Sequence, residues 1–211
     1  MPRIYESFDQ KSLEWDLVRL GKLTGSQVSD ALMKPSTKGY QNLKAKLIAE
    51  RLTGEIKRMS APSMDWGHAH EPMARIEHAL VCNHVITEVA FVELTDDFGC
   101  SPDGLVNEDG IVEYKCPYNS SVHISTLLND KVPPEYVPQI QWNMFVTGRR
   151  WCKFVSFDPR MPEALRLHEI HVPVDYEYQA VMVEKAEAFM AELDSGQDRL
   201  QEIIDRYEQA S

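Results

Sequence analysis

The sequence predicts a single α/β domain, in which a central mixed β-sheet is flanked by helices on both faces. Three observations predict this class. The chain has 211 residues, which is the length of one domain, and 43% of them are hydrophobic, enough for a core. The spacing of apolar residues is helical up to about residue 81, strand-like over 85–116, and then alternates between the two.

The first 60 residues are expected to be helical. Three leucines at helical spacing predict a helix over residues 10–20 that stops at Gly21. The segment Thr24-Gly-Ser-Gln27 fits a capping box that opens a second helix through about Leu32. A mobile loop over 33–40 contains proline and glycine, and a helix from about Gln41 to Leu52 follows it.

The middle of the chain is expected to change from helix to antiparallel strands. A helix from Asp65 to about Val81 should bury a stripe formed by Ala69, Met73, Ile76 and Leu80. Three strands follow over 85–94, 100–106 and 111–116. The short polar connections between them, at 96–97 and 107–110, predict hairpins.

The last third is expected to alternate between helix and strand. A helix over 134–147 has apolar residues at helical spacing, and strands are expected over 152–157 and 168–174. From Asp175 to the end the sequence is helical and acidic, with a break near Gly196.

The charge distribution, the hydropathy and the cysteine content limit the classes of function that are possible. The net charge of −11 argues against nucleic acid, yet residues 1–60 carry 11 basic and 7 acidic side chains, against 4 and 12 in residues 161–211. The charge distribution therefore permits an anionic partner at the N-terminal part. No apolar run is long enough to span a bilayer, and the first twenty residues lack the apolar stretch of a signal peptide, so a cytoplasmic protein with no membrane partner is expected. Four cysteines without a CxxC pair indicate neither a disulfide framework nor a zinc knuckle.

The strongest local motif is Ser101-Pro-Asp103-Gly, followed by Glu113-Tyr-Lys115. Residues two apart in a strand share a face, so Glu113 and Lys115 point the same way, and a hairpin brings Asp103 beside Glu113. A bound Mg²⁺ is the usual means of keeping two adjacent carboxylates ionised, and a lysine beside them can orient a water. The same spacing also fits a solvent-facing hairpin with a surface Glu–Lys pair. His68 and His70 do not form a zinc pair, because residues two apart on a helix do not face each other.

Further blocks accompany this motif in the same order. They are Trp15–Gly21, Leu23–Ser26, Trp66–Glu71, Cys100–Leu105, Glu113–Pro117, Gln139–Thr147 and Phe157–Arg160. Together they resemble the lambda exonuclease and YqaJ-like viral recombinase family of the PD-(D/E)xK nuclease superfamily. The resemblance implies a restriction-endonuclease-like core, with residues 1–60 gripping the DNA end, 61–174 forming the catalytic core and 175–211 a C-terminal helical segment.

The resemblance also implies roles for individual residues. Asp103, Glu113 and the backbone carbonyl of Tyr114 would bind metal, Glu71 would help to hold a second ion, Lys115 would be the catalytic lysine and Gln141 the active-site glutamine. Arg19, Ser26 and Ser101 would bind a terminal 5′-phosphate. As a weaker expectation, Lys34, Lys38 and Lys44 would contact the DNA backbone. Without the resemblance, Glu71 and Gln141 would be surface helix residues, and Arg19 would pair with Asp16.

The function implied is a 5′→3′ exonuclease that acts on double-stranded DNA ends with two Mg²⁺ ions, Mn²⁺ being plausible. It would release mononucleotides and leave 3′ single-stranded tails for recombination. The resemblance further implies a ring-shaped homotrimer, a single-strand annealing protein as partner, and a phage or prophage origin. Two alternatives remain open: an endonuclease on the same core, and a non-catalytic module that binds DNA ends or a recombinase.

Overall fold

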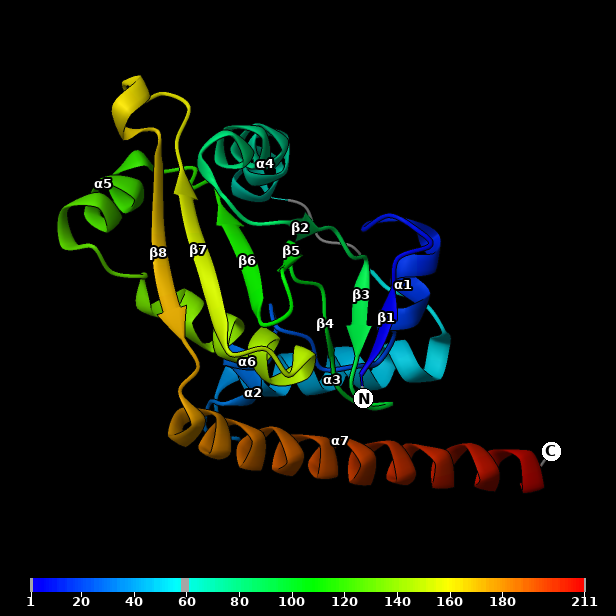
Figure 1. Ribbon diagram of the computed structural model, residues 1–211. Helices are drawn as coiled ribbons and strands as arrows, with labels where there is room; N and C mark the ends of the chain where they lie inside the picture. The colour runs from blue at the N-terminus through cyan, green and yellow to red at the C-terminus, as the bar shows by residue number, and fades with distance from the viewer. Residues whose placement is uncertain (1, 58–60, 211) are drawn as a thin grey trace.

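The computed structural model describes residues 2–57 and 61–210 (Figure 1). Its strands are β1 (Arg3–Tyr5), β2 (Ile86–Thr87), β3 (Phe91–Glu93), β4 (Gly99–Cys100), β5 (Gly104–Val106), β6 (Gly110–Lys115), β7 (Trp151–Phe157) and β8 (Leu167–Pro173). Its helices are α1 (Leu13–Arg19), α2 (Val28–Ala31), α3 (Lys38–Thr53), α4 (Pro62–Val81), α5 (Ser120–Asn129), α6 (Val137–Thr147) and α7 (Tyr176–Ala210), with 3₁₀ turns at Pro134–Tyr136 and Glu163–Leu165.

The strands form two sheets. The larger one has the order β2-β5-β6-β7-β8, in which β6 and β7 are parallel and the other neighbours are antiparallel. The smaller one has the order β1-β3-β4 and is antiparallel. A mixed sheet flanked by helices is the α/β architecture that the sequence predicts, and the prediction is confirmed.

Each face of the larger sheet has its own core. Helix α4 covers one face, where Ala74 packs with Val112, Tyr114, Val155 and Phe157 (Figure 1). Helices α2, α3, α6 and α7 cover the other face around a larger core. Its largest fully buried side chains include Trp142, Phe154 and Phe189. Because β6 lies between the two cores, its side chains reach both α4 and α6.

Several predicted strands are shorter than expected. The strand over 85–94 is two strands, β2 and β3, which belong to different sheets, and the strand over 100–106 is divided in the same way into β4 and β5. The two predicted hairpin connections are confirmed, since β3 pairs with β4 and β5 with β6 in antiparallel register. Because of this division, residues 101–103 lie outside regular structure. In this irregular segment the Asp103 side chain faces the end of β6, where it accepts a hydrogen bond from the amide of Tyr114.

The predicted buried stripe of α4 is wrong. Met73, Ile76 and Leu80 are 46%, 64% and 82% exposed, and Ala69 is also exposed. The face turned to the sheet carries small and polar residues, with Ala74 and His78 buried. His78 fits there because its ring hydrogen-bonds with the hydroxyl of Tyr114 and with Glu169. The hydrogen-bond partners of His78 therefore decide which face of α4 is buried, and the spacing of its apolar residues does not.

Other helices also depart from expectation. The capping-box segment forms a turn, in which the Gln27 side chain accepts from the amide of Thr24, but α2 begins only at Val28. Helix α7 continues through Gly196 without a break, and α5 is a further helix that is not among the expected ones. Among the described residues, no helix has both the length and the apolar character needed to cross a bilayer.

Candidate active site

Strand β6 carries the centre of the site. The Nζ atom of Lys115 lies 2.7 Å from Oε1 of Glu113, and the Glu113 side chain is almost fully buried. Tyr114 points to the opposite face, toward α4. The shared orientation of Glu113 and Lys115 is therefore confirmed, and the exposed hairpin that the spacing alone also allowed is excluded.

Asp103 joins the pair from the irregular segment before β5. Its Oδ2 atom accepts a hydrogen bond from the backbone amide of Tyr114 at 2.7 Å. Burial raises the pKa of Asp103 well above its usual range, and the negative charges of Glu113 and Glu71 raise it further. A site that crowds three carboxyl groups in this way favours a positive partner.

Helix α6 holds Glu113 from the other side through Gln139 and Asn143. The Gln139 amide donates to Oε1 of Glu113 and accepts from Lys115 Nζ at 3.2 Å, while Asn143 Nδ2 donates to Oε2 of Glu113 at 3.1 Å. These two residues are four apart and so occupy one face of the helix. Neither residue is among those expected from the sequence, although their spacing places them on one helix face.

Gln141 does not lie beside the carboxylates, which corrects the placement expected for it. Its side chain is buried on the far side of α6, where it donates to the carbonyl of Pro173 and accepts from the amide of Asp175. Two residues along a helix correspond to a rotation of about 200°, so Gln141 faces away from Gln139. The glutamine at the site is Gln139.

Helix α4 contributes Glu71 and Arg75. Arg75 Nη2 donates to Oε1 of Glu71 at 2.7 Å and lies 3.9 Å from Oδ1 of Asp103, and its Nη1 donates to the backbone carbonyl of Asp103. Glu71 is thus connected to Asp103 through one guanidinium group. No sequence motif marks Arg75 for this position.

The carboxylates of the site also shift the pKa values of Lys115 and Cys116. Burial alone would lower the pKa of Lys115, but Glu113 and Asp103 hold it above its usual value, so Lys115 is a cation in the metal-free protein. Burial, together with the charges of Glu71 and Asp103, raises the pKa of Cys116 to about 12. Cys116 therefore stays a thiol, as expected for a packing residue.

Arg19 and Ser101 come together through Trp15. The guanidinium carbon of Arg19 lies 3.7 Å from the centre of the Trp15 ring, and the indole Nε1 of Trp15 donates to Ser101 Oγ at 2.9 Å. Arg19 Nη2 also reaches Thr24 Oγ1 at 3.4 Å. An arginine held over an aromatic ring, close to a serine hydroxyl, is suited to bind a phosphate oxygen.

Ser26 is exposed on the turn of residues 24–27, which precedes α2, so it does not lie in the first turn of a helix as expected. The turn lies against the site at Gly25. A Cβ atom on Gly25 would be 2.2 Å from Oδ1 of Asn143 and 3.4 Å from Cγ of Gln139. Gly25, which directly precedes Ser26, therefore packs against the helix that holds Glu113.

The three lysines expected at the DNA backbone differ in their surroundings. Lys34 and Lys38 are exposed, and Lys38 is the first residue of α3. Lys44 forms a salt bridge to Glu192 of α7 at 3.0 Å. Its ammonium group already has a carboxylate partner, which weakens the expectation for Lys44.

The oxygen donors fit a hard divalent cation such as Mg²⁺. Asp103, Glu113 and Glu71 supply carboxylates, and the carbonyl of Tyr114 is on the same strand end. The raised pKa of Asp103 shows that its charged form is destabilised by burial and by the neighbouring carboxyl groups, and a bound cation would stabilise that charged form.

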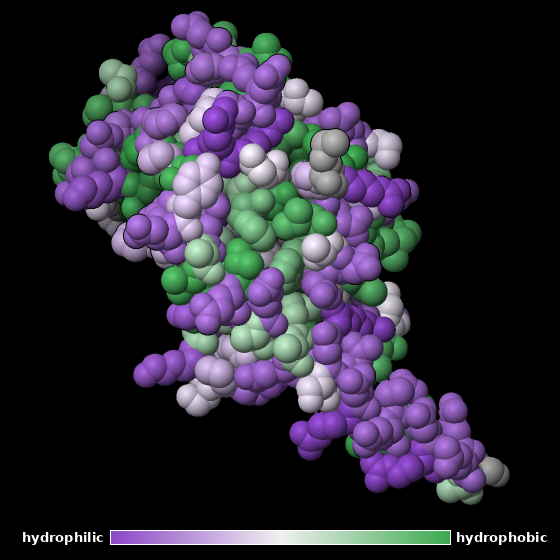
Figure 2. All heavy atoms as spheres, turned by 60° about the horizontal axis from the view of Figure 1, so that its bottom comes forward, coloured by the Kyte–Doolittle hydropathy of each residue, from purple (hydrophilic) through white to green (hydrophobic). Residues whose placement is uncertain are grey.

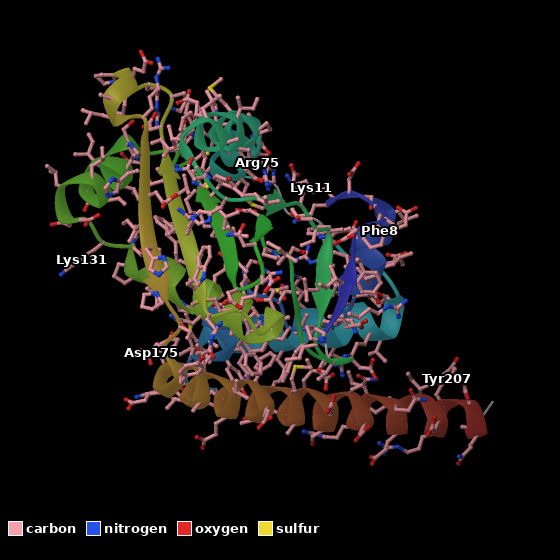
Figure 3. All side chains as sticks on the ribbon, viewed as in Figure 1. Phe8, Lys11, Arg75, Lys131, Asp175 and Tyr207 are labelled. Atoms are coloured by element: carbon pink, nitrogen blue, oxygen red, sulfur yellow. The ribbon has the colours of Figure 1, made fainter. Side chains whose placement is uncertain are left out.

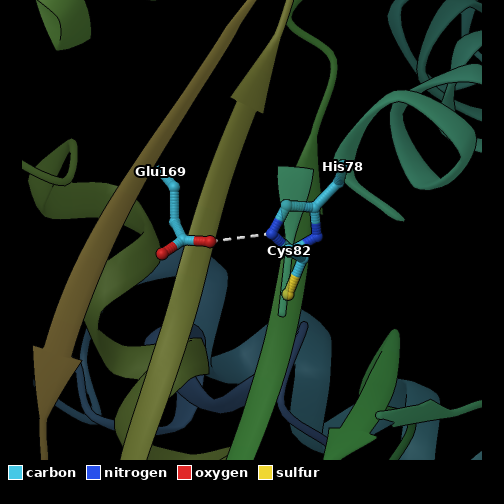
Figure 4. A group of neighbouring side chains, drawn as sticks. All are labelled: His78, Cys82 and Glu169. Carbon is cyan, nitrogen blue, oxygen red and sulfur yellow. Dashed lines mark hydrogen bonds and ion pairs between the residues drawn. The ribbon is translucent and has the colours of Figure 1, made fainter. Parts of the chain in front are cut away.

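Among the described residues, the one group of three His, Cys, Asp or Glu side chains whose ligand atoms all lie within 4.8 Å of one another is His78, Cys82 and Glu169 (Figure 4); the carboxylate oxygens of Asp103, Glu113 and Glu71 are spread more widely. His78 Nε2 and Glu169 Oε2 are 2.7 Å apart and already hydrogen-bonded. Glu169 also forms a salt bridge to Lys153. These partners make the cluster an anchor between α4 and β8.

Comparison with known proteins identifies the relatives of this fold. Residues 14–150 match the model of the YqaJ-like viral recombinase domain. The crystal structure of an alkaline exonuclease from Laribacter hongkongensis has 36% sequence identity to the chain, a TM-score of 0.85, and a coverage of 93% of this chain and 100% of that one. The same exonuclease in complex with dAMP gives a TM-score of 0.86 at the same identity and coverage.

A more distant structure shares the fold. A phage-related exonuclease from Haemophilus somnus 129PT has a TM-score of 0.68 at 13% identity, covering 85% of this chain and 96% of that one. No curated protein sequence matches significantly. The family match spans more than half of the chain and includes every residue of the carboxylate site. The chain therefore belongs to the YqaJ-like viral recombinase domain family.

Proposed function

We propose that the protein is a Mg²⁺-dependent 5′→3′ exonuclease that acts on double-stranded DNA ends and releases mononucleotides. The observation that carries the proposal is the convergence of Asp103, Glu113, Lys115 and Gln139 at the end of β6, beside the Arg19 and Ser101 pair. The similar structures named alkaline exonuclease, one of them in complex with dAMP, support the same reaction class.

The metal would be held by Asp103, Glu113, the Tyr114 carbonyl and Glu71, and Mn²⁺ could replace Mg²⁺. Bound there, one or two ions would supply Lewis-acid stabilisation of the negative charge that develops on the scissile phosphate. Lys115 would act as a hydrogen-bond donor to the attacking water or to the phosphate, because its neighbours keep it protonated. Gln139 would fix the Lys115 ammonium group in position.

The 5′ end would bind at Arg19, Ser101 and Ser26. Arg19 would contact the terminal phosphate, and Trp15 would hold the guanidinium in place by stacking. Lys34 and Lys38 would lie along the duplex backbone, with Lys44 contributing only if its pair with Glu192 opens. Recognition of a terminal phosphate restricts cleavage to ends and gives the reaction its polarity.

The proposed biological setting is recombination in a phage or prophage. A viral recombinase domain fits a phage or prophage protein that prepares 3′ single-stranded tails for a single-strand annealing partner. A ring-shaped homotrimer around DNA would allow processive digestion. These parts of the proposal rest on the resemblance alone.

The test compares digestion of a linear duplex with that of a closed circle, in Mg²⁺ and in chelator, for the wild type and Lys115→Ala. The strands carry a label at either end, with and without a 5′-phosphate. Metal-dependent loss of 5′-phosphorylated linear DNA, absent in the variant, is expected. Cleavage of the circle would instead indicate an endonuclease, and binding of ends without cleavage would indicate a binding module.

A further inference from the structure

Arg75 is a cation placed between two of the carboxylates that are proposed to bind metal. Its Nη2 is 2.7 Å from Oε1 of Glu71 and 3.9 Å from Oδ1 of Asp103. Figure 3 labels Arg75 where α4 approaches the strands. A divalent ion bound to these two carboxylates would be repelled by the positive charge of Arg75.

The Arg75 side chain is fixed in this place. Its guanidinium carbon lies 5.1 Å from the centre of the Tyr114 ring, and Nη1 donates to the backbone carbonyl of Asp103. The side chain is only 20% exposed, and its partner Glu71 is four residues earlier on the same helix. A rigid fork of this kind cannot move aside without losing several contacts at once.

The charges at the site explain why a cation is needed there. Glu71, Asp103 and Glu113 are three carboxyl groups, and Lys115 is paired with Glu113. Without Arg75, Glu71 and Asp103 would face each other with no positive charge between them. Arg75 therefore performs, in the metal-free protein, the neutralisation that a divalent ion would perform in the loaded one.

We propose that Arg75 is a built-in counter-cation, a positioning residue that stabilises the carboxylate cluster and lowers its affinity for divalent cations in the absence of DNA. The proposal rests on the proposed function only in assigning Glu71 and Asp103 to the metal. A charge of +1 about 6 Å from a charge of +2 in water weakens ion binding about tenfold. Tight ion binding would then need the negative charge of the DNA phosphate.

The test is titration of the DNA-free chain with Mn²⁺ in a calorimeter, for the wild type and Arg75→Gln. The variant is expected to bind Mn²⁺ about tenfold more tightly, because the repulsion is removed. Arg75→Lys retains the positive charge and should stay near the wild-type affinity. Arg166→Gln is the matched control, since Arg166 pairs with Glu77 of the same helix at 3.8 Å and should leave Mn²⁺ binding unchanged.

Thermal unfolding supplies a second readout that does not depend on catalysis. In chelator, Arg75→Gln should melt at a lower temperature than the wild type, and Mn²⁺ should raise its Tm by more than it raises that of the wild type. If the variant does not fold in chelator, recovery of folding by Mn²⁺ supports the proposal. Failure of Mn²⁺ to restore folding contradicts it.

The outcomes separate this proposal from the exonuclease assignment. Equal or weaker Mn²⁺ binding by Arg75→Gln, in a chain whose wild type digests DNA, overturns the counter-cation role alone. A wild type that binds Mn²⁺ but digests no DNA contradicts the proposed function, while tighter binding by the variant still supports the role of Arg75. If neither the DNA-free wild type nor Arg75→Gln binds Mn²⁺, the counter-cation role is overturned, whereas the exonuclease assignment is decided by the digestion assay alone.

Discussion

The two glutamines of α6 have different surroundings, although they are only two residues apart. Gln139 contacts Glu113 and Lys115, whereas Gln141 makes its hydrogen bonds within the fold, with Pro173 and Asp175. The amide groups are chemically identical. Their place on the helix therefore decides which one serves the site.

Substitution of each glutamine is expected to have a different effect. Gln139→Ala should reduce DNA digestion at least tenfold, because Lys115 loses a hydrogen bond that fixes it, and should leave the Tm nearly unchanged. Gln141→Ala should lower the free energy of unfolding by about 1–3 kcal/mol, because buried groups lose their partners, while the folded fraction stays active. Nuclease assays and urea unfolding of both variants provide the check, and a reversed pattern would restore Gln141 as the active-site residue.

The sequence predicts part of the site at this scale and misses part of it. The strand period of two correctly places Glu113 and Lys115 on one face, because β6 is regular. The helix period would have selected Gln139 with Asn143, four residues apart, but Gln141 was assigned by resemblance alone. Trp15 and Arg75 could not be predicted, because their contacts, to Ser101 and to Asp103, join segments far apart in the chain.

Asp158 gives the protein a defined sensitivity to acid. Burial alone would raise its pKa, but hydrogen bonds from Arg160 and Ser120 hold the pKa of Asp158 at about 2, below the ordinary 3.8. A carboxyl group with a lowered folded-state pKa contributes stability that is complete above the unfolded pKa and is lost as the pH falls through the folded pKa. The loss attributable to Asp158 should therefore occur between about pH 4 and pH 2.

Asp158→Asn should lower the free energy of unfolding at pH 7 by about 1–3 kcal/mol, because it removes a charged, hydrogen-bonded partner of Arg160. The variant should also lose less stability than the wild type between pH 4 and pH 2. Urea unfolding at several pH values measures both effects. Parallel losses in the two proteins would show that Asp158 titrates normally.

At the scale of elements, the turn of residues 24–27 lies directly on α6. Gly25 is buried there, and a Cβ atom at this position would come within 2.2 Å of Asn143 Oδ1. Asn143 in turn donates to Glu113. The packing of the turn is therefore coupled to the position of a proposed metal ligand.

Gly25→Ala should displace either the turn or the Asn143 amide. The expected result is at least a tenfold loss of digestion and a loss of about 1–3 kcal/mol in the free energy of unfolding, as for an overpacked core. Gly54→Ala is the control: Gly54 has a φ of +71°, with nothing within 4 Å of an added Cβ, so it should cost about 1 kcal/mol without affecting digestion. Full activity of Gly25→Ala would separate the turn from the site.

The sequence predicts most of the helices and strands. Its predictions are wrong where contacts with neighbouring elements, and not the spacing of apolar residues, determine the local structure. Strands β2 to β5 have only two or three residues each, too few for an alternating pattern to show where one sheet ends and another begins. On α4 the apolar stripe lies outside, because Ala74 and His78 fit the core that Tyr114 lines. Gly196 does not break α7, since a continuous helix face packs against α3.

At the scale of the whole molecule, α7 has two different parts. Its first half packs into the core through Met182, Ala186, Phe189, Met190 and Leu193. From Asp198 to Ala210 all residues are exposed, and this end extends beyond the rest of the molecule (Figure 1), with a mostly hydrophilic surface (Figure 2). Only the first half therefore contributes to the stability of the fold.

Deletion of residues 199–211 is expected to leave the free energy of unfolding within about 0.5 kcal/mol of the wild type, because none of the described side chains beyond residue 198 is buried. Phe189→Ala should cost about 3–5 kcal/mol, because a fully buried aromatic ring is removed from the contact with Tyr40. Urea unfolding of the three proteins at two protein concentrations gives the comparison. A loss above about 1 kcal/mol in the truncated chain that shrinks on dilution, because dilution then destabilises only the wild type, would show that Leu200, Ile203 and Tyr207 pack against a second copy of the chain.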